Sequence, residues 1–182
     1  MKIKKIVDIC KRAGRMILLN DDKHQWLGDG TAFYPMVDAP LFDKESLYAT
    51  FDITEKQQEE ILFQFETALP ENFCFANMCN NEDFADKNDI SITYKGDEYL
   101  VYHSPGGALC IKAKYLKPLN KENLEIYQRQ TENGIPYFAC KTGYMIQAVI
   151  MPIRLSDNKE FRNSLDLLYE QSIREGQVQS NA

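Results

Sequence analysis

The chain has 182 residues, of which 44 % are hydrophobic and 26 % charged, a balance typical of a globular protein with a substantial core. This composition excludes a disordered tail and a fibre, and no run approaches the ~18 consecutive apolar residues of a membrane span. The formal net charge is −6, but residues 1–15 hold six basic side chains and one acidic one, a local charge of +5 that leaves −11 on the rest. Because no apolar leader follows the N-terminus, we expect a soluble, cytoplasmic protein that contacts no membrane.

The first predicted unit, residues 1–70, combines helices with a hairpin. Apolar residues recur at helical spacing from Ile3 to Cys10, and Gly14 is a typical helix stop. Strands are then predicted at 16–20, 24–27 and 31–36, with polar turns between them. A short helix is expected at 43–50. Thr54 and Gln57 form a capping box for a longer helix that continues to Pro70.

The remainder is predicted to be rich in β-structure. Residues 71–89 are acidic and rich in Asn, which indicates a long loop between two units. The second unit, residues 90–176, contains strands predicted at 90–94, 98–102, 108–115, 124–130, 135–140 and 144–153. A helix from Asp157 to Gly176 closes it, and residues 177–182 are expected to be disordered. Antiparallel meanders with helices at both termini and in the middle indicate the α+β class, and the units can form one compact domain.

The chemistry-bearing residues show no catalytic or metal-binding pattern. The two histidines, His24 and His103, lie near predicted turns without metal-ligand spacing, and the segment 104–107 lacks the features of a phosphate-binding loop. Five cysteines occur without a C-x-x-C pair, which favours reduced thiols over a disulfide framework or a zinc site. We therefore expect no enzyme activity, no cofactor and no metal. An enzyme that uses His24 with Asp21 or Asp22 is the alternative, and it requires a deep pocket at that hairpin.

The first helix has one basic face. A protein that touches duplex DNA needs a surface with positive charge, and a local patch attracts phosphates even when the net charge is negative. The alternative is a solvated amphipathic face without a partner. The predicted DNA-binding residues are Lys4, Lys5, Lys11, Arg12 and Arg15.

Two short segments carry a family resemblance. Residues 149–155 (Val-Ile-Met-Pro-Ile-Arg-Leu) resemble the strand that closes the bacterial DNA polymerase sliding clamp, a processivity factor, where the pattern ends in Met-Pro-Met-Arg-Leu. Residues 29–33 (Asp-Gly-Thr-Ala-Phe) are similar to that family's Asp-Gly-His-Arg-Leu turn. In the family both segments line one apolar pocket that takes a short peptide from replication and repair proteins. The resemblance implies a peptide-binding site formed by Gly30, Phe33, Val149, Met151, Pro152, Ile153 and Arg154, with Arg154 binding a peptide carboxylate or carbonyl.

The resemblance also implies an architecture. It suggests helix-plus-strand repeats, for which residues 3–36 and 54–115 are the candidates, with basic helices facing DNA inside a ring. Because the chain is shorter than the three domains of that family, ring closure requires a homo-oligomer that pairs through sheet edges. The leading hypothesis is a non-enzymatic, clamp-like accessory protein that contacts DNA and a peptide. The alternative is a small intracellular interaction or scaffold protein that dimerises through its terminal helices and has no nucleic-acid role.

Overall fold

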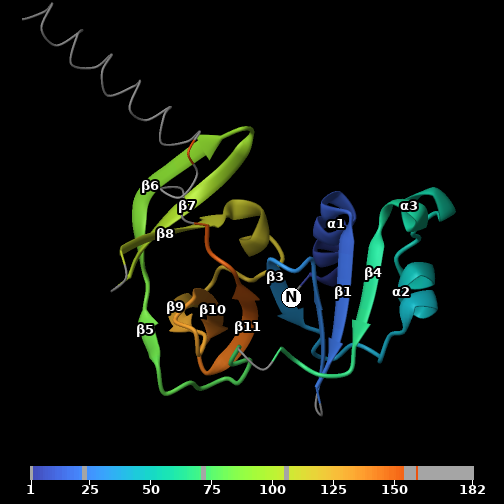
Figure 1. Ribbon diagram of the computed structural model, residues 1–182, viewed down its shortest axis with the longest axis horizontal. Helices are drawn as coiled ribbons and strands as arrows, with labels where there is room; N and C mark the ends of the chain where they lie inside the picture. The colour runs from blue at the N-terminus through green and yellow to red at the C-terminus, as the bar shows by residue number, and fades with distance from the viewer. Residues whose placement is uncertain (1, 22–23, 71–72, 105–106, 154–158, 160–182) are drawn as a thin grey trace, which may run out of the picture.

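The computed structural model describes residues 2–21, 24–70, 73–104, 107–153 and 159. The chain begins with a helix and a three-stranded meander, continues through two short helices and the middle strands, and ends on a second three-stranded meander (Figure 1). The elements are α1 (Ile3–Ala13), β1 (Arg15–Asn20), β2 (Gln25–Gly28), β3 (Ala32–Pro35), α2 (Lys44–Thr50), α3 (Glu55–Glu60), β4 (Leu62–Glu66), β5 (Glu82–Phe84), β6 (Asp86–Tyr94), β7 (Asp97–Ser104), β8 (Gly107–Lys112), the 3₁₀ helix η1 (Ala113–Leu116), β9 (Leu124–Gln130), β10 (Pro136–Thr142) and β11 (Met145–Ile150).

The strands form two sheets, which confirms the predicted α+β class. The large sheet has the order β4-β1-β2-β3-β11-β10-β9-β5, in which β4 is parallel to β1 and the other neighbours are antiparallel. A small antiparallel sheet, β6-β7-β8, lies at the β9–β11 end of the molecule, away from α2 and α3 (Figure 1). Strands from both predicted units therefore share one sheet and one core.

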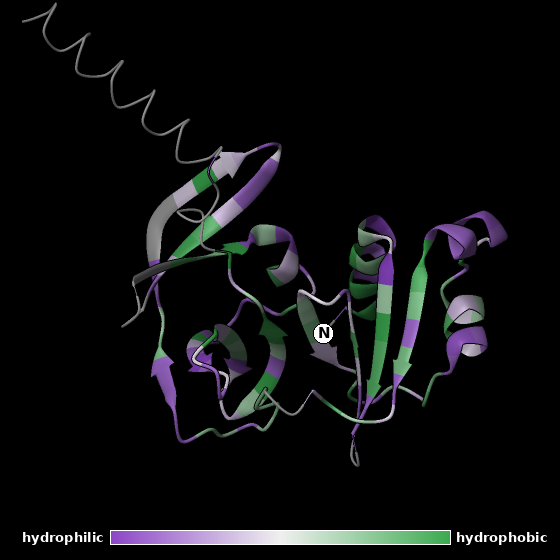
Figure 2. Cartoon of the chain, viewed as in Figure 1, coloured by the Kyte–Doolittle hydropathy of each residue, from purple (hydrophilic) through white to green (hydrophobic). Residues whose placement is uncertain are grey.

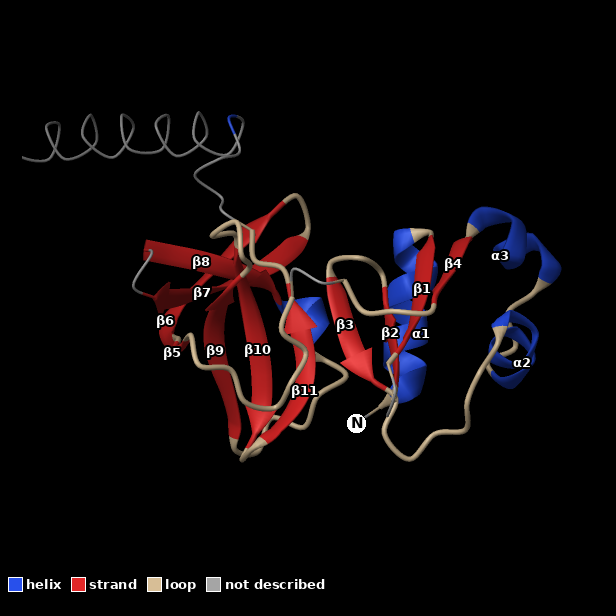
Figure 3. Cartoon of the chain, turned by 60° about the horizontal axis from the view of Figure 1, so that its bottom comes forward, coloured by secondary structure: helices blue, strands red, loops and turns tan. Residues whose placement is uncertain are grey.

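Helix α1 covers one face of the large sheet because its apolar stripe meets alternate residues of β1. Ile6, Val7 and Cys10 pack with Met16 and Leu18 in the main core, and the helix lies behind β1 and β2 in Figure 3. Gly14 ends the helix as predicted, at a φ of 64° that favours glycine. The helix η1 contributes to the same core, so both helices cover the same face.

The order of elements is the same in the two halves of the large sheet. Helix α1 precedes the meander β1-β2-β3, and η1 precedes the meander β9-β10-β11. The third strand of each meander pairs with the other, with Val149 opposite Phe33 and Ile150 opposite Ala32. Residues 3–36 form a helix followed by three strands, but residues 54–115, the other predicted repeat, do not form a second unit of this kind. Their strands are divided between two sheets, and the corresponding order of elements spans residues 113–150.

The long helix predicted from Thr54 to Pro70 was also wrong. Helix α3 ends at Glu60, is hydrophilic throughout (Figure 2) and buries no residue, and Ile61 has extended backbone angles. Residues 62–66 instead form β4, which pairs in parallel with β1 from Arg15–Leu62 to Leu19–Glu66. Pairing with a strand more than 40 residues away supplies the backbone hydrogen bonds, so tertiary contacts override the helical spacing of the apolar residues.

The predicted loop at 71–89 contains strands. Glu82–Phe84 forms the edge strand β5, which pairs with β9, and β6 begins at Asp86. The acidic sequence that suggested a loop suits an edge strand, because charged side chains protect an open edge. The predicted helix at 157–176 and the tail at 177–182 lie outside the described residues, apart from Lys159. No helix in the part of the chain that the structure describes is long and apolar enough to cross a membrane.

Candidate functional site

The face of the large sheet opposite α1 carries a second apolar cluster with a cavity above it. Alternation along β1 directs Ile17 and Leu19 to this face, where they meet Phe33 and Val149. Residues 73–79, named here the covering segment, lie over part of the cluster. The remaining space is a cavity of about 560 Å³, named here the groove, with an apolar floor formed by β1, β3 and the chain at β11.

The groove brings together four of the residues predicted to bind a peptide. Gly30, Phe33, Val149 and Met151 all line it, although they come from segments more than 110 positions apart. The link is the β3–β11 pairing, which continues in a hydrogen bond from the Met151 N–H to the carbonyl oxygen of Thr31 at 2.7 Å. The sequence alone gave no reason to expect this pairing apart from the family resemblance.

The other three predicted residues do not line the groove as described. After Met151 the chain leaves the large sheet, so Pro152 is half-buried outside the groove lining. Ile153 exchanges backbone hydrogen bonds with Cys110 of β8 at 2.8 and 3.0 Å and packs on the small sheet. The prediction for these two was therefore wrong, because the strand changes sheets at the proline. Arg154 lies outside the described residues.

Gly30 holds its position through a turn that its neighbour Asp29 organises. The buried Asp29 carboxylate accepts hydrogen bonds from the backbone N–H groups of Thr31 and Ala32, at 2.9 and 3.0 Å, and from the Tyr115 hydroxyl at 3.0 Å. Gly30 has a φ of 90°, and a Cβ there would lie 3.1 Å from Nη1 of Arg15. The turn therefore favours glycine for its backbone angle, and a side chain there would also displace the Arg15 guanidinium slightly.

The polar margin of the groove carries a cation that the sequence interpretation assigned elsewhere. Arg15 was predicted on the basic face of the first helix, but it is the first residue of β1, because Gly14 ends the helix before it. Its Nε and Nη2 atoms donate to Oε1 of Gln64, at 3.1 and 2.8 Å, and Glu66 lies at the same margin. The groove thus combines an apolar floor with one positive and one negative side chain.

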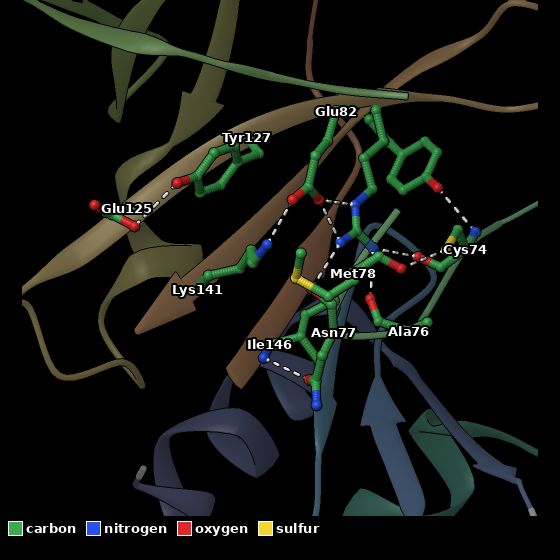
Figure 4. A network of polar contacts seen from close by, with 11 residues as sticks. Cys74, Ala76, Asn77, Met78, Glu82, Glu125, Tyr127, Lys141 and Ile146 are labelled. Carbon is green, nitrogen blue, oxygen red and sulfur yellow. Dashed lines mark hydrogen bonds and ion pairs between the residues drawn. The ribbon is translucent and has the colours of Figure 1, made fainter. Parts of the chain in front are cut away.

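The covering segment is held from beneath by Arg129, whose side chain is fully buried. Arg129 donates through Nη1 to the carbonyl oxygens of Cys74 and Ala76, both at 2.8 Å, and through Nη2 to that of Asn77 at 3.3 Å (Figure 4). Its charge is balanced by Glu82, which Nη2 contacts at 2.6 Å. Sequence patterns missed Arg129, because an arginine in an alternating strand is usually exposed.

Aromatic contacts fix the same segment to the sheet. The rings of Phe75 and Trp26 meet edge to face, with centroids 4.8 Å apart, and those of Phe73 and Tyr137 meet at 5.1 Å. The backbone N–H of Cys74 also donates to the Tyr137 hydroxyl at 2.8 Å. Phe73 and Phe75 consequently form one wall of the groove, together with Leu69 and Pro70.

The basic residues of α1 lie on the opposite side of the molecule from the groove. Lys4, Lys5 and Arg12 are exposed and Lys11 is half-buried. Lys11 and Arg12 line a cavity of about 450 Å³ together with Asp8 and Glu60, so their charge is partly offset. The DNA-binding role of these four residues stays a prediction.

Sequence patterns missed a basic region that lies next to α1. The Lys5 ammonium donates to the carbonyl oxygen of Lys117 at 3.4 Å, and the Lys2 backbone N–H donates to that of Pro118 at 3.0 Å. These bonds join the start of α1 to the residues that follow η1. Lys117, which is exposed, thereby lies next to the basic face of α1.

The residues of the alternative enzyme hypothesis have structural partners. Asp21 accepts from the His24 backbone N–H at 2.6 Å and from the Trp26 indole N–H at 3.0 Å, and His24 Nδ1 lies 3.9 Å from its carboxylate. These residues border a cavity of about 390 Å³. Among the described residues that line it there is no serine, threonine or cysteine. Among the described residues no group of three or more His, Cys, Asp or Glu side chains is placed to hold a metal ion. Asp22 lies outside the described part.

Comparison with known proteins adds no relative. None of the protein-family models, curated proteins or solved structures compared with the chain matches it.

Proposed function

We propose that this protein is a non-enzymatic accessory protein that binds an extended apolar peptide of a partner in the groove. The observation that carries the proposal is the meeting of Gly30, Phe33, Val149 and Met151 around one cavity. These residues belong to the two segments that resemble one peptide site of the sliding-clamp family. Their convergence supports a shared binding role more strongly than either segment does alone.

The lining of the groove specifies the chemistry of the peptide. A cavity of about 560 Å³ falls within the ~300–1,000 Å³ of small-ligand sites. Its floor and its aromatic wall favour aliphatic or aromatic side chains, which gain free energy when they leave water. Arg15 favours an acidic group of the peptide at its end of the groove, whereas Glu66 disfavours one nearby.

Selection from a random peptide library displayed on phage tests the proposal. We expect enrichment of peptides with adjacent apolar residues and one acidic residue, and we expect Met151→Asp to weaken their binding at least tenfold. Met151 is half-buried, so this variant leaves the core intact. Leu41→Asp is the matched control, because Leu41 is 80 % exposed and lies outside the groove. Equal binding by both variants would contradict the proposal.

A second candidate function is weak contact with duplex DNA through the face that carries α1 and η1. The observation that favours it is the hydrogen bond from the Lys5 ammonium to the backbone carbonyl of Lys117, which joins α1 to the residue that follows η1 on one face of the sheet. Such a helical face, opposite a peptide groove, is what the clamp resemblance implies. Few phosphates are within reach of so small a patch, so the binding would be weak at physiological ionic strength and its dependence on salt would be shallow.

Fluorescence anisotropy with a labelled duplex, over a range of salt concentrations, tests this contact. Each phosphate contact contributes about −0.9 to the slope of log affinity against log salt. We expect the triple variant Lys4→Ala, Lys5→Ala, Lys117→Ala to make the slope shallower by about 2–3. The control is Lys44→Ala with Lys56→Ala on the two short helices, which we expect to leave the slope unchanged. An unchanged slope in the triple variant would rule out the contact.

A further inference from the structure

The covering segment contains two neighbouring thiols. Cys74 and Cys79 are both free and half-buried. The Cys74 thiol donates to the carbonyl oxygen of Met78 at 3.9 Å, and that carbonyl carbon is bonded to the backbone nitrogen of Cys79. This contact places the Cys74 sulfur beside the backbone that leads into Cys79. The two thiols therefore belong to one turn of the covering segment.

The other three cysteines are in different surroundings. Cys10, Cys110 and Cys140 are buried in the cores formed by the sheets. Burial raises the pKa of all three thiols, which keeps them protonated and shields them from reagents. Cys74 and Cys79 are thus the thiols of the described chain that combine partial exposure with a neighbouring thiol.

We propose that Cys74 and Cys79 form a reversible disulfide when the protein meets a peroxide, and that this bond locks the wall of the groove. The first part of the proposal stands on the thiol pair alone. The second part rests on the proposed peptide-binding function, because the bond fixes the segment that carries Phe73 and Phe75.

The oxidation is balanced by hydrogen peroxide. Burial raises the pKa of the Cys74 thiol, which stays protonated until the second step. In the first step the Cys79 thiolate attacks one peroxide oxygen, the O–O bond breaks, and the leaving hydroxide takes a proton to become water. The resulting sulfenic acid is attacked by the Cys74 sulfur. The S–S bond forms as the S–O bond breaks, and the departing oxygen leaves as a second water with the Cys74 proton. A dithiol reductant reverses the reaction by thiol–disulfide exchange.

The contacts of Arg129 determine how a Cys74–Cys79 disulfide would affect the covering segment. Its guanidinium holds the carbonyl oxygens of Cys74, Ala76 and Asn77, all within the loop that the disulfide closes. Closing the loop around these contacts restricts the unfolded chain and keeps the segment on the sheet. A wall that is already ordered removes part of the entropy cost of binding, so the oxidised protein should hold a peptide more tightly.

Thiol labelling and mass spectrometry test the disulfide directly. The native protein is exposed to hydrogen peroxide, alkylated, unfolded and digested with trypsin, which leaves both cysteines in the peptide 57–87. We expect this peptide to lose two hydrogen atoms and to resist alkylation until a reductant is added. We also expect the Tm of the oxidised protein to rise by roughly 3–8 °C. Alkylation of both cysteines after peroxide, or a disulfide between two molecules, would overturn the proposal.

Variants separate the bond from its effect on the groove. Cys79→Ser removes the disulfide and keeps the loop polar, so we expect the loss of two hydrogens and the rise in Tm to disappear. The matched control is Cys110→Ser, which we expect to retain both. Oxidation should tighten binding of a library-selected peptide about threefold or more in the wild type and not in Cys79→Ser. If the disulfide forms but peptide affinity does not change, the proposal that the bond regulates the groove is wrong. The proposal that the two thiols form a disulfide would still hold.

Discussion

At the scale of single residues, the candidate site depends on groups whose burial is visible only in the folded chain. Arg129 is fully buried, and its guanidinium donates hydrogen bonds to the Glu82 carboxylate and to three backbone carbonyl oxygens. A buried charge without its partners is strongly unfavourable, so this residue ties the covering segment to the sheet. Gly30 contributes at the other side of the groove, where its positive φ favours glycine and a Cβ atom would press on the Arg15 side chain.

Truncating Arg129 should therefore be costly. We expect Arg129→Ala to lower the free energy of unfolding by about 3–5 kcal/mol, because Glu82 and three carbonyl groups lose their buried partner. Urea denaturation measures this change. The control is Lys112→Ala, which breaks the partly exposed ion pair with Asp97 and should cost under about 1 kcal/mol. Similar losses in the two variants would show that Arg129 does not hold the segment.

Alanine substitutions at two glycines separate the contact with Arg15 from the effect of backbone strain. Gly30 and Gly134 both have positive φ, 90° and 74°, but a Cβ at Gly134 meets nothing within 4 Å. We expect Gly134→Ala to cost about 1–2 kcal/mol from backbone strain alone, and Gly30→Ala to cost more because Arg15 must move. Thermal denaturation compares the two. A smaller loss for Gly30→Ala would contradict the close packing assigned to that turn.

At the scale of elements, local patterns predicted what local contacts determine. The spacing from Ile3 to Cys10 and the stop at Gly14 gave α1, and short hairpins gave β1–β3 and β9–β11 with bounds within a few residues. The elements that local patterns predicted wrongly pair with strands far away in the sequence. Residues 62–66 join β1, and Glu82–Phe84 joins β9, across separations that no local spacing encodes. For the same reason Gly30 and Met151 could be grouped only through the family resemblance, and Arg129 not at all.

Strand β5 should loosen in acid. Burial raises the pKa of Glu82, but hydrogen bonds from Lys141 and Arg129, together with their charges, outweigh it, so the pKa lies below its ordinary value of 4.5. A lowered pKa in the folded state means that this stabilisation is present above pH 4.5 and is lost as the pH falls through the native value. We expect amide hydrogen exchange in β5, corrected for intrinsic rates, to accelerate selectively below pH 4.5. Glu82→Gln should show fast exchange at every pH. Uniform acceleration across the sheet would contradict this assignment.

At the scale of the whole molecule, the main core makes the free energy of unfolding depend on pH in the alkaline range. Burial raises the pKa of Cys10 and Cys140, and also of Tyr102 and Tyr115, above their ordinary values of 9.0 and 10.0. The folded chain keeps these groups neutral while the unfolded chain ionises, so the stabilisation is complete below pH 9 and is lost as the pH rises above it. We expect the free energy of unfolding to fall by about 1.4 kcal/mol per pH unit for each group that ionises. A curve that is flat from pH 8 to 10.5 would contradict this expectation.

The two candidate binding surfaces, the groove and the helical face, lie on opposite faces of the large sheet. The apolar groove lies on one face of the large sheet, and α1 and η1, with their lysines, cover the other. A peptide in the groove and a polyanion on the helices could be bound together without competing for space. The two meanders with the same order of elements meet through β3 and β11 at the groove.

The most direct test of the proposed function is a map of amide chemical shifts as a library-selected peptide is added to the labelled protein. We expect the largest shifts at residues 30–33 and 149–151 and along β4, with slower exchange in the covering segment. Helix α1 and the residues that follow η1 should show little change. Shifts concentrated on that helical face, with none around Gly30 and Met151, would contradict the central claim that the groove is the peptide-binding site.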